Sequence, residues 1–306
     1  MRIDRRAALT AVALLSAVSL AACGGSPSRS STGASSDDAA SGAVGGEITV
    51  FAAASLQKAY EEISTSFQEA NPGSSVTFDF QGSQDLVSNL AEGSTADVLA
   101  TADTRTMDDA AGGGLVGEQR EFATNVLSII VPEGNPAGIT GFDESLNAEG
   151  VNLVICDPES HVPCGTATKK MEETTGVTLA NPASKETKVS DVRSKVESGE
   201  ADAGIVYVTD AATAKGTEEI TIPDLGVVNH YPIATTSSST NEAGGKAFVD
   251  FVLSDKGQEI LQNTYKFGAP ADSAAATKPA MEKSTEATEP AEATEPAEPA
   301  ESGESN

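Results

Sequence analysis

The fold is set by residues 48–67, which read ITVFAAASLQKAYEEISTSF. The first residues are mostly apolar and predict a short strand, and the apolar residues after them recur at helical spacing. Ser55 stands at the turn between the two, where it is a good N-cap for the helix. The start of a helix offers free amides and the positive end of the helix dipole. This turn is therefore a candidate anion-binding position.

The same step from strand to helix recurs along the chain. Alternating strands and helices predict an α/β fold with mainly parallel sheets. In such folds ligands lie at the carboxyl ends of the strands, where helices begin. Ser83 opens the helix after the second strand, so it joins Ser55 as a candidate donor. The predicted strands are residues 48–52, 76–80, 97–101, 126–131, 151–155 and 204–208, and the later helices begin near residues 83, 166 and 189, with a last helix over 247–264.

Both ends of the chain differ in composition from the middle. Residues 1–23 have a positively charged start, an apolar run and the ending Leu-Ala-Ala-Cys, which resembles a bacterial lipobox. They predict a lipoprotein signal peptide with the lipid on Cys23; an ordinary secretory signal is the alternative. Residues 24–46 are rich in Ser, Gly and Ala and predict a flexible tether. Residues 271–306 are acidic and rich in Pro, so we expect a disordered tail.

The chain of 306 residues carries a formal net charge of −27. This acidity argues against nucleic acid as a partner, because phosphate binding takes clustered Lys and Arg, and against docking on an anionic membrane through a basic surface. It also repels anions at long range, so capture of an anion has to rest on local dipoles. An enzyme is not favoured, since the chain has two His and no Gly-x-Ser-x-Gly motif.

Cys156 and Cys164 lie eight residues apart. In an exported protein this spacing predicts a disulfide, because such bonds persist outside the cytoplasm. A zinc site made by these two thiols and His161 is an alternative, although it needs a further ligand. Two free thiols are the remaining possibility.

Five blocks of sequence, in order, resemble the signatures of periplasmic molybdate-binding proteins. The resemblance covers about residues 47–270. The chain departs from the family in the third block, where Ser160 is an extra residue and Cys164 replaces Ala. Cys is compatible there, because the family uses only the backbone at that position. The blocks are VFAAASL at 50–56, ADVLATAD at 96–103, DPESHVPCG at 157–165, DVR at 191–193 and GIVY at 204–207.

The resemblance implies the two-lobed type II fold of periplasmic binding proteins, with the ligand between the lobes. Lobe I would hold residues 47–124 plus 233–270, and lobe II residues 125–232. A short pair of crossover strands would form the hinge, and we expect each lobe to have a sheet of its own.

The resemblance also implies a site of neutral hydrogen-bond donors, with no metal cation and no cofactor. A fully ionised tetrahedral dianion only accepts hydrogen bonds, so donors alone suit it. Hydrogen phosphate carries a proton and needs an acceptor, and no Asp or Glu falls at a matched position. The implied donors are the hydroxyl and amide of Ser55 and of Ser83, the hydroxyl of Tyr207, and the amides of Cys164 and Val192.

The function implied by the resemblance is that of the substrate-binding component of an ABC importer, in an actinobacterial-type lipoprotein. It would capture molybdate and deliver it to a permease driven by an ATPase. We expect a monomer outside the cytoplasm, anchored to the outer face of the cell membrane through Cys23. The alternatives are a binding protein for tungstate or another oxyanion, an exported hydrolase, and a structural surface lipoprotein.

Overall fold

The computed structural model describes residues 44–271. The predictions for the signal peptide, the lipid on Cys23, most of the tether and residues 272–306 of the tail lie outside that range. Within it, no helix has both the length and the hydrophobicity that a membrane span needs.

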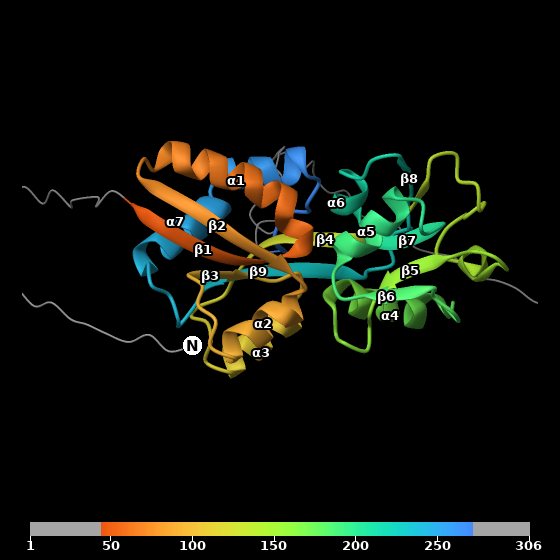
Figure 1. The fold of residues 1–306 in the computed structure, drawn as a ribbon, viewed down its shortest axis with the longest axis horizontal. Helices are drawn as coiled ribbons and strands as arrows, with labels where there is room; N and C mark the ends of the chain where they lie inside the picture. Colours follow the sequence, from red (N-terminus) through yellow and green to blue (C-terminus); the bar gives the residue numbers. More distant parts are fainter. Residues whose placement is uncertain (1–43, 272–306) are drawn as a thin grey trace, which may run out of the picture. The chain divides into compact units, whose positions relative to one another are not determined.

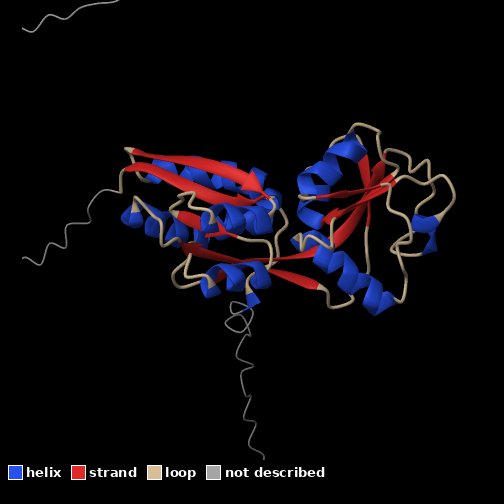
Figure 2. Ribbon diagram, turned by 60° about the horizontal axis from the view of Figure 1, so that its bottom comes forward, coloured by secondary structure: helices blue, strands red, loops and turns tan. Residues whose placement is uncertain are grey.

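The first half of the structure packs helices on both faces of a sheet (Figures 1 and 2). The opening strand and helix follow the predicted pattern, because Tyr60, Ile63 and Phe67 are buried on one face of α1. The ring of Phe67 lies 5.5 Å from that of Phe248, edge to face, which ties α1 to α7. The elements are β1 (Gly46–Ala53), η1 (Ala54–Leu56), α1 (Gln57–Ala70), β2 (Ser74–Gln81), α2 (Ser83–Ala91), β3 (Val98–Ala100), α3 (Thr104–Gly112), α7 (Glu242–Leu253), α8 (Asp255–Glu259) and η3 (Ile260–Thr264).

The second half is a smaller arrangement of the same kind. Its core is one cluster of apolar side chains that all lie between residues 127 and 227. The two clusters of the first half come from residues 48–123 and 231–267. The elements of the second half are η2 (Glu144–Asn147), β5 (Leu153–Cys156), α4 (Pro163–Thr175), β6 (Ser184–Glu186), α5 (Val189–Glu197), β7 (Ala203–Tyr207), α6 (Val208–Ala211) and β8 (Thr217–Ile220).

Two strands carry the chain from one half to the other and back. They are β4 (Arg120–Pro132) and β9 (Val228–Thr235), and they pair antiparallel from Arg120↔Ile233 to Val126↔Val228. Figure 1 shows both strands reaching from the first half into the second. They are therefore the described segments that link the two cores.

The expectation of two separate sheets was wrong. The strands form one hydrogen-bonded path in the order β2-β1-β3-β9-β4-β7-β5-β6, with β8 beside β4. The reason is the length of β4, since its 13 residues pair first with β9 and then with β7 and β8. The pairs β1–β2, β1–β3, β5–β6 and β5–β7 are parallel, as βα repeats require, and every antiparallel pair involves β4 or β9.

Two helices differ from their predicted limits. Helix α4 begins at Pro163, earlier than predicted, because proline suits the first turn, where no amide is needed. The predicted last helix starts earlier, at Glu242, and is interrupted at Ser254. The Oγ of Ser254 accepts the amide of Gly257 at 3.3 Å and so starts a new helix, α8.

Candidate functional site

A small cavity lies where several chain segments begin a helical turn. It has a volume of about 10 Å³, which is room for one small species. Four of the five predicted donor residues line it: Ser55, Ser83, Cys164 and Tyr207. The full lining is Ala53, Ala54, Ser55, Gln81, Gly82, Ser83, Ala102, Val162, Pro163, Cys164, Lys188, Val189 and Tyr207.

Ser55 lies in the short turn η1 at the end of β1, but it does not act as the N-cap that the sequence predicted. No side-chain cap is made at the start of η1 or of α1. The Ser55 Oγ instead lies 3.1 Å from the Oη of Tyr231 on β9. The hydroxyl is thus held by a strand distant in sequence rather than by its own helix.

Ser83 is the first residue of α2 and is only 1% exposed. The amides of Asp85 and Leu86 donate to the Gly82 carbonyl, so the unpaired amides of this helix start belong to Ser83 and Gln84. The Ser83 Oγ accepts the amide of Ala102 at 3.0 Å. Its own proton therefore remains available for a ligand.

Cys164 is the second residue of α4, directly after Pro163. Thr166 is the first residue of this helix whose amide has a backbone acceptor, the Val162 carbonyl at 2.9 Å. The amides of Cys164 and Gly165 come before it, where a helix has no internal acceptors. The helix start is thus a local anion-binding position.

The loop before α4 absorbs the extra residue Ser160 in a tight turn. The Ser160 Oγ donates to Asp157 Oδ2 at 2.5 Å, and the His161 amide donates to the Pro158 carbonyl at 3.3 Å. The Ser160 hydroxyl has the largest effect on the pKa of Asp157 and, together with the Glu159 amide, holds it below its usual value. His161 takes a positive φ of 57°. Cys164 therefore still reaches the cavity.

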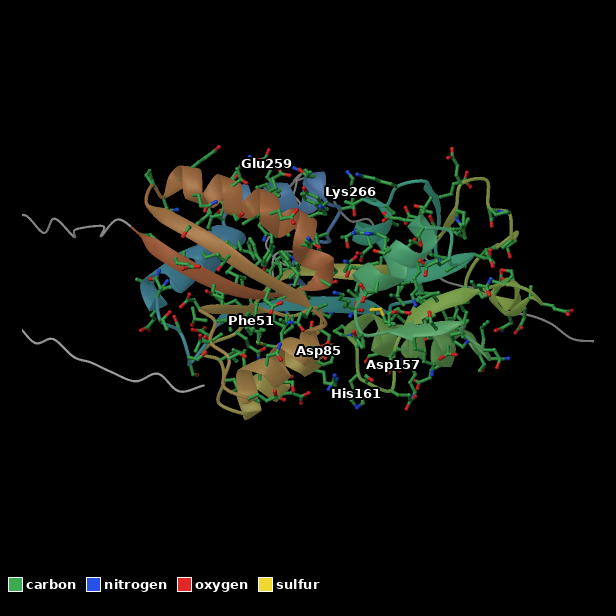
Figure 3. All side chains as sticks on the ribbon, viewed as in Figure 1. Phe51, Asp85, Asp157, His161, Glu259 and Lys266 are labelled. Carbon is green, nitrogen blue, oxygen red and sulfur yellow. A yellow bond between two sulfur atoms is a disulfide. The ribbon has the colours of Figure 1, made fainter. Side chains whose placement is uncertain are left out.

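Cys156 and Cys164 form a disulfide, seen as the yellow bond in Figure 3. It ties the end of β5 to the start of α4. Both thiols are used, so the alternative zinc site with His161 loses two of its three ligands. Within residues 44–271, no group of three or more His, Cys, Asp or Glu side chains is placed to hold a metal ion.

The structure does not bring Val192 to the cavity. Val192 lies a turn inside α5, fully buried, and its side chain packs against Gly204. Lys188 and Val189, at the start of the same helix, line the cavity instead. Position in the family motif could not reveal this, because the choice between neighbouring amides depends on where the helix begins.

Tyr207 ends β7, and its ring is buried. The Nδ2 of Asn229, on β9, donates to the Tyr207 Oη at 3.0 Å. Burial raises the pKa of the Tyr207 hydroxyl well above its usual value, so the group stays protonated and can donate.

Sequence reasoning missed the residues behind these donors, above all Asn125, Asn229 and Tyr231. The first two are polar side chains in strands, and they are only 2% and 7% exposed. An Asn directly before the apolar strand residues Val126 and Leu127 is the signal that could have pointed to Asn125. Lys188 was also missed, and it is the one charged residue in the lining.

The lining contains no carboxylate. The nearby carboxyl of Asp210, in α6, is buried and does not line the cavity. Burial raises its pKa to about 7, opposed by the charge of Arg193. Taken together, the free amides and hydroxyls make a cavity that offers hydrogen bonds and accepts few. Such a cavity is suited to a small anion.

These features define an extracytoplasmic binding protein of the two-lobed kind. The model for bacterial extracellular solute-binding proteins matches residues 48–264, and the chain belongs to that family. Within it, the chain is 43% identical over 248 residues to the molybdate-binding protein ModA of Mycobacterium tuberculosis, covering 80% of this chain and 91% of that protein. It is 32% identical over 227 residues to ModA of Escherichia coli, covering 71% and 87%.

The solved structures agree on the fold. The periplasmic molybdate-binding protein of Azotobacter vinelandii matches with a TM-score of 0.63 at 18% identity, over 73% of this chain and 99% of that one. The fold is therefore the type II arrangement that the sequence resemblance implied, and the chain is a ModA-type solute-binding protein.

Proposed function

We propose that this protein captures molybdate between its two lobes and delivers it to an ABC importer. One observation carries the proposal: hydroxyls and helix starts from both halves converge on a cavity without a carboxylate. A fully ionised tetrahedral oxyanion needs only donors, and a bond to a charged acceptor is worth roughly 1.5–3 kcal/mol. The relatives named molybdate-binding protein support the choice of cargo.

The donors we assign are the hydroxyls of Ser55, Ser83 and Tyr207 and the amides at the starts of α2 and α4. At α5, the position of the helix start favours Val189 over Val192, since Val189 lines the cavity. The amide of Val192 itself remains a prediction from the family motif.

The lobes we assign are residues 47–124 plus 233–270 and residues 125–232. The crossing strands β4 and β9 contain both boundaries, so bending of this pair would open and close the cavity. Ligands trapped by such closure are released intact, and we propose that the chain catalyses no reaction and holds no cofactor.

The partners we propose are the permease and ATPase of the importer, with the binding protein acting as a monomer outside the cytoplasm. A lipid on Cys23 would hold it at the outer face of the cell membrane. Mass spectrometry of the exported protein tests the anchor, because a diacylated Cys23 and loss of residues 1–22 are expected.

Calorimetry on the purified protein tests the cargo. We expect micromolar or tighter binding of molybdate and tungstate, since about 8 kcal/mol corresponds to micromolar affinity. Sulfate should bind more weakly because its oxygens lie closer to the central atom, and phosphate more weakly because it carries a proton. Equal affinity for phosphate and molybdate, or no binding of any oxyanion, would contradict the proposal.

A further inference from the structure

Three hydroxyls line the cavity, and the oxygen of each forms a hydrogen bond on the side away from the cavity. They belong to Ser55, Ser83 and Tyr207. We propose that Asn125 and Asn229, on the crossing strands, are positioning residues that turn the protons of Ser55 and Tyr207 into the cavity. They would thereby make the site selective for anions that carry no proton. This inference rests on the proposed function and explains how its selectivity would arise.

Asn229 acts on Tyr207. Its Nδ2 donates to the Ala102 carbonyl at 2.9 Å and to the Tyr207 Oη at 3.0 Å. A carbonyl can only accept, so it fixes which end of the Asn229 amide faces this way. The Tyr207 oxygen therefore receives a proton from Asn229. A side-chain hydrogen bond also joins Tyr207 and Tyr231, and the Tyr231 oxygen already receives Asn125. The inference therefore requires the Tyr207 proton to point into the cavity, which Tyr207 lines, rather than at Tyr231.

Asn125 acts on Ser55 through Tyr231. Its Oδ1 accepts the amide of Val126 at 3.0 Å, so its Nδ2 must face the hydroxyls. That nitrogen donates to Thr209 Oγ1 at 2.9 Å and to Tyr231 Oη at 3.2 Å. Tyr231 then has a proton to give to the Ser55 Oγ, 3.1 Å away. Ser55 in turn points its own proton at the ligand.

Ser83 shows the same arrangement with a backbone group. The Ala102 amide donates to the Ser83 Oγ, while the Ala102 carbonyl receives Asn229. All three hydroxyls are thus supplied with a donor from behind, and all three present a proton in front. Chains of hydrogen bonds of this kind reinforce one another in a buried setting.

The two Asn side chains belong together. Asn125 and Asn229 are cross-strand partners in the β4–β9 pair, the segment that links the lobes. Asn229 connects Ala102 of the first half with Tyr207 of the second, and Asn125 reaches Thr209 of the second half. The same pair therefore sets proton direction on both sides of the cavity.

The test is Asn229→Asp, which has the same shape and no donor toward Tyr207. An ionised Asp accepts from Tyr207, and a protonated Asp gives its proton to the Ala102 carbonyl and again accepts from Tyr207. Either way the Tyr207 proton turns away and a lone pair faces the cavity. Arsenate is the informative comparison, because this tetrahedral oxyanion carries at least one proton at pH 7 and could donate to that lone pair.

We expect calorimetry to show molybdate affinity falling roughly tenfold or more in Asn229→Asp. Arsenate affinity should fall clearly less or rise, so that the ratio between the two anions shifts. Asn263→Asp is the matched control, since it adds the same charge at an exposed position and should leave the ratio unchanged. An equal loss of affinity for both anions would assign Asn229 a merely structural role. An unchanged affinity for molybdate would also overturn the proposal.

Two further measurements cover a variant that fails to fold. Asn125→Asp tests the Ser55 branch with the same pair of anions. Neutron diffraction on the unmodified protein with molybdate locates the deuterons directly, and we expect those on Ser55 and Tyr207 to face the anion. A deuteron of Tyr207 directed at Asn229 would refute the inference. Failure of the unmodified protein to bind molybdate would instead contradict the proposed function.

Discussion

Gly82 and Thr187 touch across the two halves, so closely that a β-carbon on Gly82 would lie 2.3 Å from the Thr187 carbonyl oxygen. Gly82 precedes α2 of the first half, and Thr187 precedes α5 of the second. The Nε2 of Gln84 donates to the same carbonyl at 3.1 Å. The two halves thus meet in a close backbone contact beside the cavity, which Gly82 lines.

Gly82→Ala should therefore weaken molybdate binding by roughly tenfold or more, because the halves could no longer approach fully. The φ of −61° and ψ of 140° at Gly82 suit alanine, so the free protein should keep its melting temperature. Calorimetry and solution scattering with and without molybdate measure the two effects. Gly112→Ala is the control, since nothing lies within 4 Å of a β-carbon there. Unchanged affinity in Gly82→Ala would mean that the contact is not needed for capture.

Ser83→Ala should weaken molybdate binding about ten- to a hundredfold, through loss of one charge-assisted hydrogen bond. It also leaves the Ala102 amide without its acceptor. Ser88→Ala, on the exposed side of the same helix, should bind as tightly as the unmodified protein. If both variants kept their affinity in calorimetry, the anion would have to lie elsewhere.

Reduction of the Cys156–Cys164 disulfide, or its replacement by two Ala, should lower the melting temperature. Chain-entropy arguments give roughly 2–3 kcal/mol for a loop of this length. Molybdate affinity should fall modestly, because the start of α4 would be less ordered before binding. The order of preference among oxyanions should stay the same, since no donor changes. A changed order of preference would show that the bond shapes the cavity itself.

Asp210 predicts a pH dependence of stability. Burial raises its pKa to about 7 from an ordinary 3.8, so between these values the folded chain holds a proton that the unfolded chain has lost. The free energy of unfolding should therefore fall as pH rises from 4 to 7 and level off above that. Asp210→Asn removes this effect. The free energy of unfolding of the variant minus that of the unmodified protein should therefore be about 2–3 kcal/mol larger at pH 8 than at pH 5. Denaturant unfolding of both proteins at the two pH values measures the difference. A constant difference would place the carboxyl pKa outside this window.

The sequence was a good guide wherever local chemistry decides the structure. The apolar strand before Ser55 and the glycine before Ser83 were enough to predict two of the helical turns at the cavity. The blocks shared with the family predicted the two-lobed fold, and the eight-residue spacing predicted the disulfide.

Features that depend on register could not be predicted. The pairing of Asn125 with Asn229 requires knowing how β4 aligns with β9, more than a hundred residues later. The shared sheet depends on how far β4 extends beyond that pairing. The family motif pointed to Val192, whereas Val189, at the predicted start of the same helix, is the residue that lines the cavity.

The disposition of protons in the cavity has a consequence for energetics. A site that only donates takes up no proton when it receives a fully ionised oxyanion, and it releases none. Binding then exchanges no protons with the solvent. The heat of binding is therefore the same in every buffer, whatever the ionisation enthalpy of that buffer. This holds over the pH range in which the cargo stays ionised and the protonation of the neighbouring Asp210 does not change. Within that range, external pH would not affect delivery of the cargo to the importer.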